Sequence, residues 1–140
     1  MVTGTPLRAR VVHPGTGSGP VLTLGAPLSF WGGVDPKRGV VSDPRHPDFE
    51  TSIAGSVLVL PSAIGSSSSS AIMLELIREG RAPAAVVMGK ADAILALGVV
   101  VAEELGYRGI PIVELSGPAL EQVASAPSVD VGRDGSITFP

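Results

Sequence analysis

The sequence predicts an α/β fold of three layers, β/β/α, built on a parallel βαβαβ core with an added layer of strands. The main observation is the order of elements in residues 56–115, which is strand, helix, strand, helix, strand. This order gives a parallel sheet with right-handed crossover connections. Strand patterns before and after this unit supply the second β layer. Because 140 residues suit one domain, we predict a single domain over residues 1–140.

The first part of the chain predicts short strands and a long loop. Leu7–Val12 alternates apolar and polar residues and predicts a strand. Gly15–Pro20 predicts a turn, and Val21–Leu24 predicts a second short strand. The next 28 residues, Gly25–Ser52, are rich in glycine and proline and show little periodicity. Compact domains rarely keep so long an irregular loop without a function. The alternative is a few short strands joined by turns, one of them at Val40–Val41.

The central unit alternates buried strands with helices. Continuous apolar runs predict buried strands at Ser56–Leu60 and Ala84–Met88. Helical spacing predicts a helix at Ala71–Glu79 that ends at Gly80. A second helix, at Ala91–Leu105, is apolar on nearly all sides, so we expect it to be largely buried. We expect its apolar residues to pack in the core: Ile94, Leu95, Leu97, Val99 and Val101. The last predicted elements are a strand at Ile110–Leu115, a short helix at Pro118–Ala124 and a hairpin at Val129–Phe139 around Asp134–Gly135.

The composition excludes several classes of function. The net charge is −3 and the sequence shows no basic stripe, which argues against nucleic-acid binding. There is no cysteine, which excludes disulfides, a thiolate nucleophile and an iron–sulfur cluster held by this chain, and no His, Asp and Glu residues have metal-ligand spacing. The absence of cysteine fits a cytoplasmic location. No apolar stretch is long enough for a signal peptide or a membrane span, so we expect no membrane partner.

A run of five serines, Ser66–Ser70, follows Gly65 between a buried strand and an amphipathic helix. Ligands bind at such junctions in α/β sheets, at the carboxyl ends of strands. A helix start also offers backbone N–H groups and the positive end of the helix dipole. Hydroxyl groups there could bind a carboxylate or phosphate, or take up a proton as an alkoxide. The alternative is ordinary helix capping, which needs only one serine.

Other catalytic patterns are incomplete. No lysine follows Gly65 as in a Walker-type phosphate loop, and the nucleophile elbow of serine hydrolases lacks its second glycine. The two histidines, His13 and His46, are more typical of surface residues than of catalysts. The residues alone therefore leave open a non-catalytic binding or assembly module. If the chain takes part in catalysis, another chain must supply a metal or the remaining acid and base.

The segment from Trp31 to Pro36 is a second candidate site. The adjacent Gly32 and Gly33 allow the backbone to approach a ligand or a partner closely. Trp31 could fill the core or anchor an interface, and Asp35 is typical of a turn. Three basic residues nearby could meet an anionic substrate or only water: Lys37, Arg38 and Arg45.

Four segments together resemble the small subunit, or swivel domain, of the aconitase X family: PLSFWGGVDPKRGVV (27–41), DPRHP (43–47), SIAGSVLVLPSAIGSSSSS (52–70) and APAAVVMGKADAILALGVVVAEE (82–104). They occur in order, and the likeness covers about Leu7 to Leu115, which is most of the chain. The resemblance implies a small β/β/α domain that closes over a large subunit. That large subunit would carry iron or an iron–sulfur cluster, with a 2Fe–2S cluster favoured.

The resemblance also implies a reaction and roles for residues. In aconitase-like enzymes a swivel-domain serine removes a proton next to a carboxylate, and this serine best matches Ser66, with Ser70 as the alternative. We expect Gly65 and Ser67, together with the pair Gly32 and Gly33, to bind the substrate. The family's bacterial branch dehydrates cis-3-hydroxy-L-proline to Δ1-pyrroline-2-carboxylate, and its archaeal branch dehydrates phosphomevalonate. The motifs favour the bacterial branch, so the expected partners are an aconitase X large subunit and a small anionic hydroxy acid.

Overall fold

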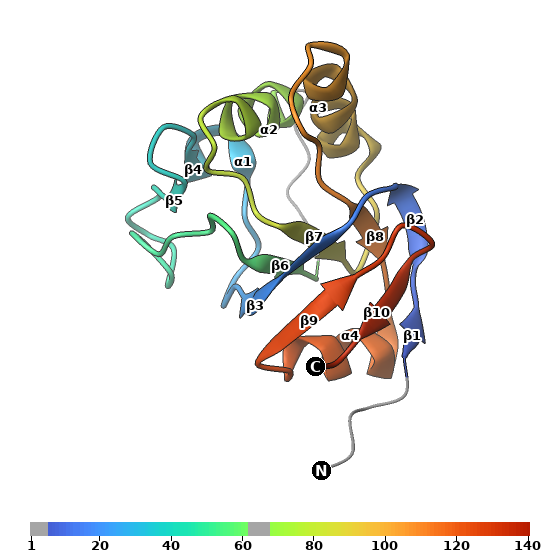
Figure 1. The fold of residues 1–140 in the computed structure, drawn as a ribbon. Coiled ribbons are helices and arrows are strands. Elements are labelled where there is room, and N and C mark those ends of the chain that lie inside the picture. Colours follow the sequence, from blue (N-terminus) through green and yellow to red (C-terminus); the bar gives the residue numbers. More distant parts are fainter. Residues whose placement is uncertain (1–5, 62–67) are drawn as a thin grey trace.

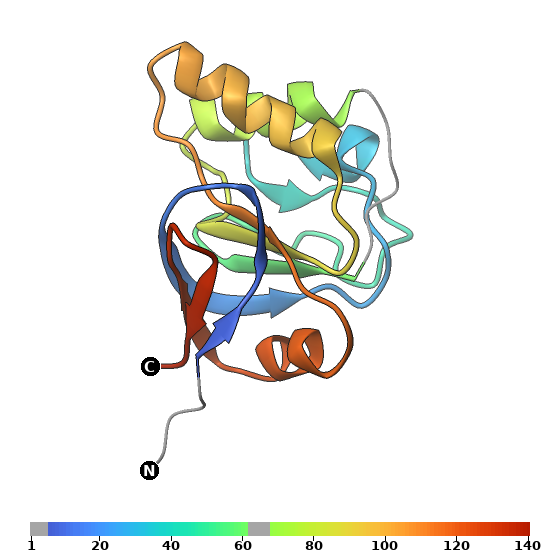
Figure 2. The ribbon, with the colours of Figure 1, turned by 90° about the vertical axis from the view of Figure 1, so that its right-hand side faces the viewer.

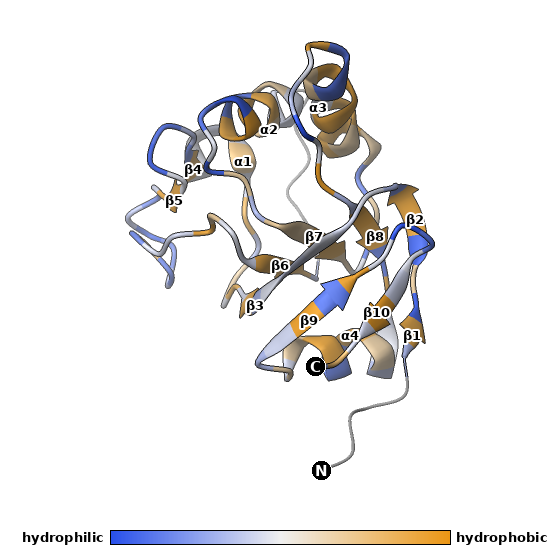
Figure 3. Cartoon of the chain, in the orientation of Figure 1, coloured by the Kyte–Doolittle hydropathy of each residue, from blue (hydrophilic) through white to orange (hydrophobic). Residues whose placement is uncertain are grey.

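The computed structural model describes residues 6–61 and 68–140. They form three layers: helices, a mainly parallel sheet, and a second group of antiparallel strands (Figure 1). The predicted α/β fold with an added β layer is therefore confirmed. Apolar residues concentrate in the strands and on the helices, and hydrophilic residues in the connections (Figure 3).

The middle layer is the predicted parallel core. Its neighbouring parallel strands are β3 (Gly17–Thr23), β6 (Val57–Leu60), β7 (Ala85–Met88) and β8 (Ile112–Glu114), and β2 (Arg10–His13) runs antiparallel to β8. All residues of β6 and β7 are buried, because layers cover both faces of these strands. This explains their uninterrupted apolar sequence and confirms the predicted βαβαβ unit.

The second β layer joins the two ends of the chain. It contains β1 (Leu7–Arg8), β10 (Ser136–Thr138), β9 (Ser128–Val131) and the first half of β3, all antiparallel. Only Ala9 separates β1 from β2, although they lie at opposite ends of the strand order. The two layers thus share β3, and the short segment from β1 to β2 also passes from one layer to the other. An apolar cluster fills the space between them: Ala9, Val57, Val59, Ala85, Val87, Val113, Leu115, Val123, Val129, Val131 and Ile137.

The turn predicted at Gly15–Pro20 is wrong, because β3 already begins at Gly17. Its glycines serve close packing, not a turn. A Cβ atom on Gly17 or Gly19 would come closer than 3.0 Å to the carbonyl oxygen of Ala84 or Gly55, respectively. Glycine is needed where strands approach other backbone so closely.

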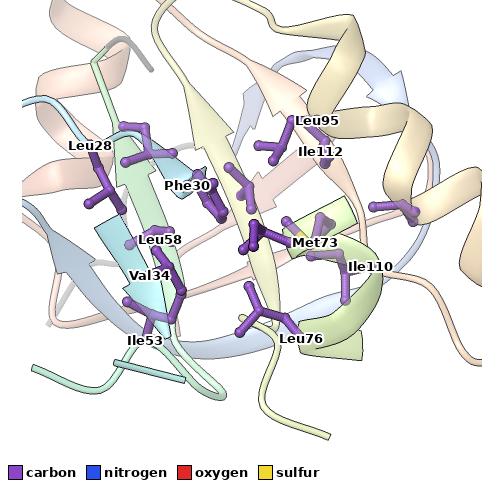
Figure 4. Packing of buried hydrophobic residues seen from close by; sticks show 14 of the residues in the cluster. Leu28, Phe30, Val34, Ile53, Leu58, Met73, Leu76, Leu95, Ile110 and Ile112 are labelled. Atoms are coloured by element: carbon purple, nitrogen blue, oxygen red, sulfur yellow. The ribbon is translucent and has the colours of Figure 1, made fainter. Parts of the chain in front are cut away.

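Three helices cover the outer face of the parallel sheet: α1 (Phe30–Gly33), α2 (Ser69–Arg78) and α3 (Ala93–Glu104). The fourth, α4 (Gly117–Ala124), lies at the opposite side of the sheet and adds Val123 to the cluster between the β layers. Side chains from α1, α2 and α3, among them Phe30, Met73 and Leu95, meet those of the sheet in a second core cluster (Figure 4). The long irregular segment contains one small hairpin, β4 (Val34–Asp35) with β5 (Val40–Val41), as the alternative interpretation expected.

The expectation that the predicted helix at residues 91–105 is largely buried is wrong. Leu95 and Val99 are fully buried on its inner side, but Ile94, Leu97 and Val101 are exposed. The reason is that α3 is an outer helix, and it lies in front of α2 when seen from its own side of the molecule (Figure 2). Within the described residues, no helix has the length and apolar character needed to cross a bilayer.

Candidate functional site

The candidate site lies at the carboxyl edge of the parallel sheet, where β3 and β6 end side by side. Residues 24–27 follow β3, and Pro61 follows β6. Together they line a small cavity of about 170 Å³: Leu24, Gly25, Ala26, Pro27 and Pro61. After Pro61 comes the serine-bearing segment, defined here as residues 62–67, and its two flanks are Pro61 and Ser68. The predicted site residues Gly65, Ser66 and Ser67 lie outside the described residues, whereas both flanks of that segment are described.

The start of α2 carries the remaining serines. Ser68 is at the N-cap position but its side chain makes no cap hydrogen bond, Ser69 is buried, and Ser70 is partly buried. The carbonyl oxygen of Ser70 packs so closely on α3 that a Cβ atom on Gly98 would come within 3.0 Å of it. The first turn of α2 is thus held against α3, which fixes the end point of the serine-bearing connection.

The predicted glycine pair lines a larger pocket of about 480 Å³. Gly32 has a φ of +77°, a left-handed conformation that glycine adopts without a steric penalty. Ser42 donates two hydrogen bonds to this segment, from its N–H to the Gly33 carbonyl (2.9 Å) and from Oγ to the Gly32 carbonyl (3.3 Å). The pocket therefore joins two sequence motifs: Pro27, Leu28, Ser29, Trp31, Gly32 and Gly33 on one side, and Ser42, Asp43, Pro44, Arg45 and His46 on the other.

The pocket and the small cavity share Pro27 as a lining residue. They therefore adjoin at the same edge of the sheet, beside Pro61. In addition, α1 contacts α2. The helix α1, which carries the glycine pair, thus lies against the helix that begins in the serine run. Trp31 does not fill the core, since 60% of it is exposed.

His46 is a buried structural residue, not the surface residue that we expected. It is 8% exposed. Its Nδ1 accepts a hydrogen bond from the Asp48 backbone N–H, so its proton sits on Nε2 and is donated to the Ala26 carbonyl, each at 3.0 Å. Nδ1 also lies 3.7 Å from the Asp48 carboxylate, but because this nitrogen acts as an acceptor and carries no proton, the two groups do not form an ion pair. The ring ties the pocket wall to the segment that follows β3. His13, partly buried, lies elsewhere, with Nε2 2.9 Å from the Glu103 carboxylate.

The pocket carries charges of both signs. The Asp43 carboxylate accepts hydrogen bonds from the Arg45 backbone N–H at 3.0 Å and from its Nε at 3.2 Å. These bonds hold the pKa of Asp43 below its ordinary value, so this side chain is a carboxylate at neutral pH. The Arg45 side chain is 91% exposed and can still reach a ligand.

The other predicted residues of this region have structural roles. Asp35 accepts hydrogen bonds from the backbone N–H groups of Lys37 and Arg38 and from the Arg38 guanidinium, which confirms that it forms a turn. The guanidinium of Arg38 also pairs with Glu50. Lys37 and Arg38 do not line the pocket, so Arg45 is the basic residue that the structure places there.

The residues of this chain do not fit an iron ion or an iron–sulfur cluster. No group of three or more His, Cys, Asp or Glu side chains within residues 6–61 and 68–140 could hold a metal. The remaining residues, 1–5 and 62–67, contain none of these four amino acids.

Sequence reasoning missed that the glycine pair and the 43–47 loop form one pocket. Both stretches belong to the resemblance, but the hydrogen bonds that hold the glycine pair come from Ser42, which is about ten positions later in an irregular segment and directly precedes the 43–47 loop. A local pattern does not reveal such pairing.

Comparison with known proteins places the chain in a family. The family model that describes the aconitase X swivel domain matches residues 6–139. Cis-3-hydroxy-L-proline dehydratase of Pseudomonas aeruginosa is 44% identical over 118 residues, which are 84% of this chain and 20% of the relative. The phosphomevalonate dehydratase small subunit of Methanothermobacter thermautotrophicus is 39% identical over 132 residues, 93% of this chain and 96% of the relative.

A solved structure agrees. A chain in the crystal structure of aconitase X from Thermococcus kodakaraensis (holo-form) matches with a TM-score of 0.82 and 32% identity, over 98% of this chain and 99% of that one. The chain spans about a fifth of the length of its hydroxyproline dehydratase relatives from Pseudomonas aeruginosa and Hypocrea jecorina. The swivel-domain model nevertheless matches nearly the whole chain, and the chain therefore belongs to the aconitase X swivel-domain family.

Proposed function

We propose that this chain is the small subunit of a two-subunit hydro-lyase that removes water from cis-3-hydroxy-L-proline and yields Δ1-pyrroline-2-carboxylate. The observation that carries the proposal is the carboxyl edge of the sheet. There the pocket lined by Trp31–Gly33 and Asp43–His46 shares Pro27 with the cavity at the ends of β3 and β6, which Pro61 also lines. Relatives named as dehydratases support the reaction class.

In this proposal Ser66 is the base, with Ser70 as the alternative. The serine oxygen takes the proton from the carbon next to the substrate carboxylate. The electron pair of that C–H bond forms a C=C bond while the neighbouring C–O bond breaks and the hydroxyl departs as hydroxide. The hydroxide takes up a proton to become water, and the serine gives up the proton that it gained, so one water is lost overall. The resulting enamine tautomerises to the imine product. The positive end of the α2 dipole favours the anionic form of a hydroxyl at the helix start. Gly65 and Ser67 contact the substrate together with the backbone of Gly32 and Gly33.

Iron or a 2Fe–2S cluster belongs to the proposed large subunit, because the part of this chain that the structure describes holds no group of metal-ligating side chains and the sequence has no cysteine. A cytoplasmic location is part of the same proposal, since a chain without cysteine suits a reducing compartment.

The charges of the pocket favour an amino acid as substrate. Asp43 and Arg45 present one carboxylate and one guanidinium on the same wall. A hydroxyproline zwitterion carries one ammonium and one carboxylate, so both charges find an opposite partner. A phosphate monoester would instead meet the repulsion of Asp43. The higher identity to hydroxyproline dehydratase agrees with this choice.

The second candidate is the small subunit of phosphomevalonate dehydratase. The relative of that name from Methanothermobacter thermautotrophicus favours it, because it is 39% identical over 93% of this chain. The same proton abstraction and loss of water would apply to that substrate.

The test is to purify the chain with its large subunit and to assay both substrates for water elimination. We expect the hydroxyproline to be dehydrated. Replacing Ser66 by Ala should lower kcat by about 10²–10⁴-fold, the usual contribution of a general base. Ser70→Ala tests the alternative base, and Ser68→Ala serves as the matched control in the same serine run. Activity only with phosphomevalonate would select the second candidate. Near-full activity of Ser66→Ala would remove Ser66 from the mechanism, and no dehydration of either substrate would contradict both candidates.

A further inference from the structure

The outer side of α3 carries an exposed apolar stripe, defined here as Ile94, Leu97, Val101 and Leu105. These side chains are 40%, 52%, 37% and 63% exposed, respectively. Their spacing of three or four residues places them on one face of the helix. The stripe runs along about 16 Å of helix, at 1.5 Å per residue. Val100, 40% exposed, lies beside it.

The fold of this chain does not need the stripe. The inner side of α3 supplies the core through Leu95 and Val99, both fully buried. The helix contacts α2 and β2 through the rest of its surface. A surface helix in a globular protein normally carries polar residues on its outer side, and a continuous apolar patch marks an interaction surface.

The connection that leads into the stripe passes beside the candidate site. Its first residue, Ile94, donates its backbone N–H to the Asp92 carboxylate at 2.9 Å, in the connection from β7 to α3. In the same connection, a Cβ atom on Gly89 would come closer than 3.0 Å to the Pro61 carbonyl oxygen. The stripe therefore begins at the edge where the serine-bearing segment leaves β6. A polypeptide that completes the site at this edge would extend directly onto α3.

We propose that the large subunit of the enzyme docks on the α3 stripe, with an apolar surface about as long as the stripe. This inference rests on the proposed function, and it names the surface through which the partner binds. In the two hydroxyproline dehydratase relatives the matched region is only 20% of the chain. Those chains therefore contain four-fifths of further polypeptide that could cover this face, which favours a large heterologous partner over a second copy of the domain.

The test measures the affinity of the full chain for its separately purified large subunit. Leu97→Asp and Val101→Asp each place a charge in the middle of the stripe, and Gln122→Asp places the same charge on exposed α4, on the other side of the sheet. We expect each stripe variant to weaken binding by roughly 30-fold or more, as for residues at the centre of an interface. The control should bind within about 2-fold of wild type. All variants should keep the wild-type thermal midpoint, because the substituted side chains are exposed.

Two results would overturn the docking surface. One is wild-type affinity of both stripe variants for the large subunit. The other is a homodimer of the isolated chain that Leu97→Asp disrupts while the large subunit still binds normally, since the occupant would then be a second copy. A wild-type pair that binds through the stripe but dehydrates neither substrate would support the docking surface and contradict the proposed function.

Discussion

Among single residues, Glu114 connects three parts of the chain: β2, the connection after β7, and its own strand β8. Its carboxylate accepts hydrogen bonds from Arg10 Nε on β2 and from the Ala91 backbone N–H after β7, each at 2.7 Å. The Arg10 side-chain bond, followed by the Ala91 bond, lowers the pKa of Glu114 below its ordinary 4.5. A carboxyl whose pKa is lower in the folded state stabilises the fold above pH 4.5, and this contribution is lost as pH falls through the folded-state pKa.

We therefore expect Glu114→Gln to unfold at a lower urea concentration than wild type at pH 7. Below pH 4.5 the difference should shrink, because protonation of the wild-type carboxyl removes the same interactions. Urea unfolding at a series of pH values measures this. A gap between the two proteins that stays constant from pH 7 down to about pH 3 would show that Glu114 does not contribute through its charge.

Local residue roles could be predicted from the sequence, and non-local roles could not. Asp35 was identified as a turn residue because its hydrogen-bond partners lie two and three positions away. His46 was placed on the surface because the carbonyl it binds belongs to Ala26, twenty residues earlier in an irregular segment. Burial of a loop histidine depends on such distant backbone groups.

At the level of elements, the βαβαβ unit was predictable because its strands are continuous apolar runs and its first helix has a clear period. The second β layer was less predictable, because glycines at the start of β3 are typical of turns as well as of close strand packing. The faces of α3 could not be told apart, since a helix apolar on nearly all sides does not show which side lacks a neighbour. The glycine pair was found as a site candidate, but its pocket depends on contacts between irregular segments.

The packing of α2 on α3 gives a prediction with an unusual sign. Alanine is a better helix former than glycine by about 1 kcal/mol, so Gly→Ala inside a helix normally stabilises it. At Gly98 the new methyl group would collide with the Ser70 carbonyl and contact the Met73 Cβ at 3.0 Å. We expect Gly98→Ala to destabilise the chain by about 1–3 kcal/mol in urea unfolding, as for overpacked cores.

The matched control is Val100→Ala, an exposed position of the same helix that should stay within about 0.5 kcal/mol of wild type. In the assembled enzyme, Gly98→Ala should also reduce dehydration, because it displaces the first turn of α2. An alanine variant as stable as wild type would mean that the two helices separate without cost.

For the molecule as a whole, the structure provides a scaffold whose site is open at one edge. The two β layers share β3 and are also joined by the chain that runs from β1 into β2, and the helices lie on this base. At the carboxyl edge this base presents the pocket, the flanks of the serine-bearing segment and the start of the α3 stripe. Among the described residues no metal-ligand group accompanies them. Such an arrangement suits one half of a site that a second polypeptide completes.

The most direct test of a site divided between two polypeptides is a complementation assay. Dehydration of cis-3-hydroxy-L-proline is measured for this chain alone, for the large subunit alone, and for the large subunit titrated with increasing amounts of this chain. We predict negligible rates for each polypeptide by itself and a rate that rises and then saturates on mixing. Full activity of either polypeptide without the other would contradict the account.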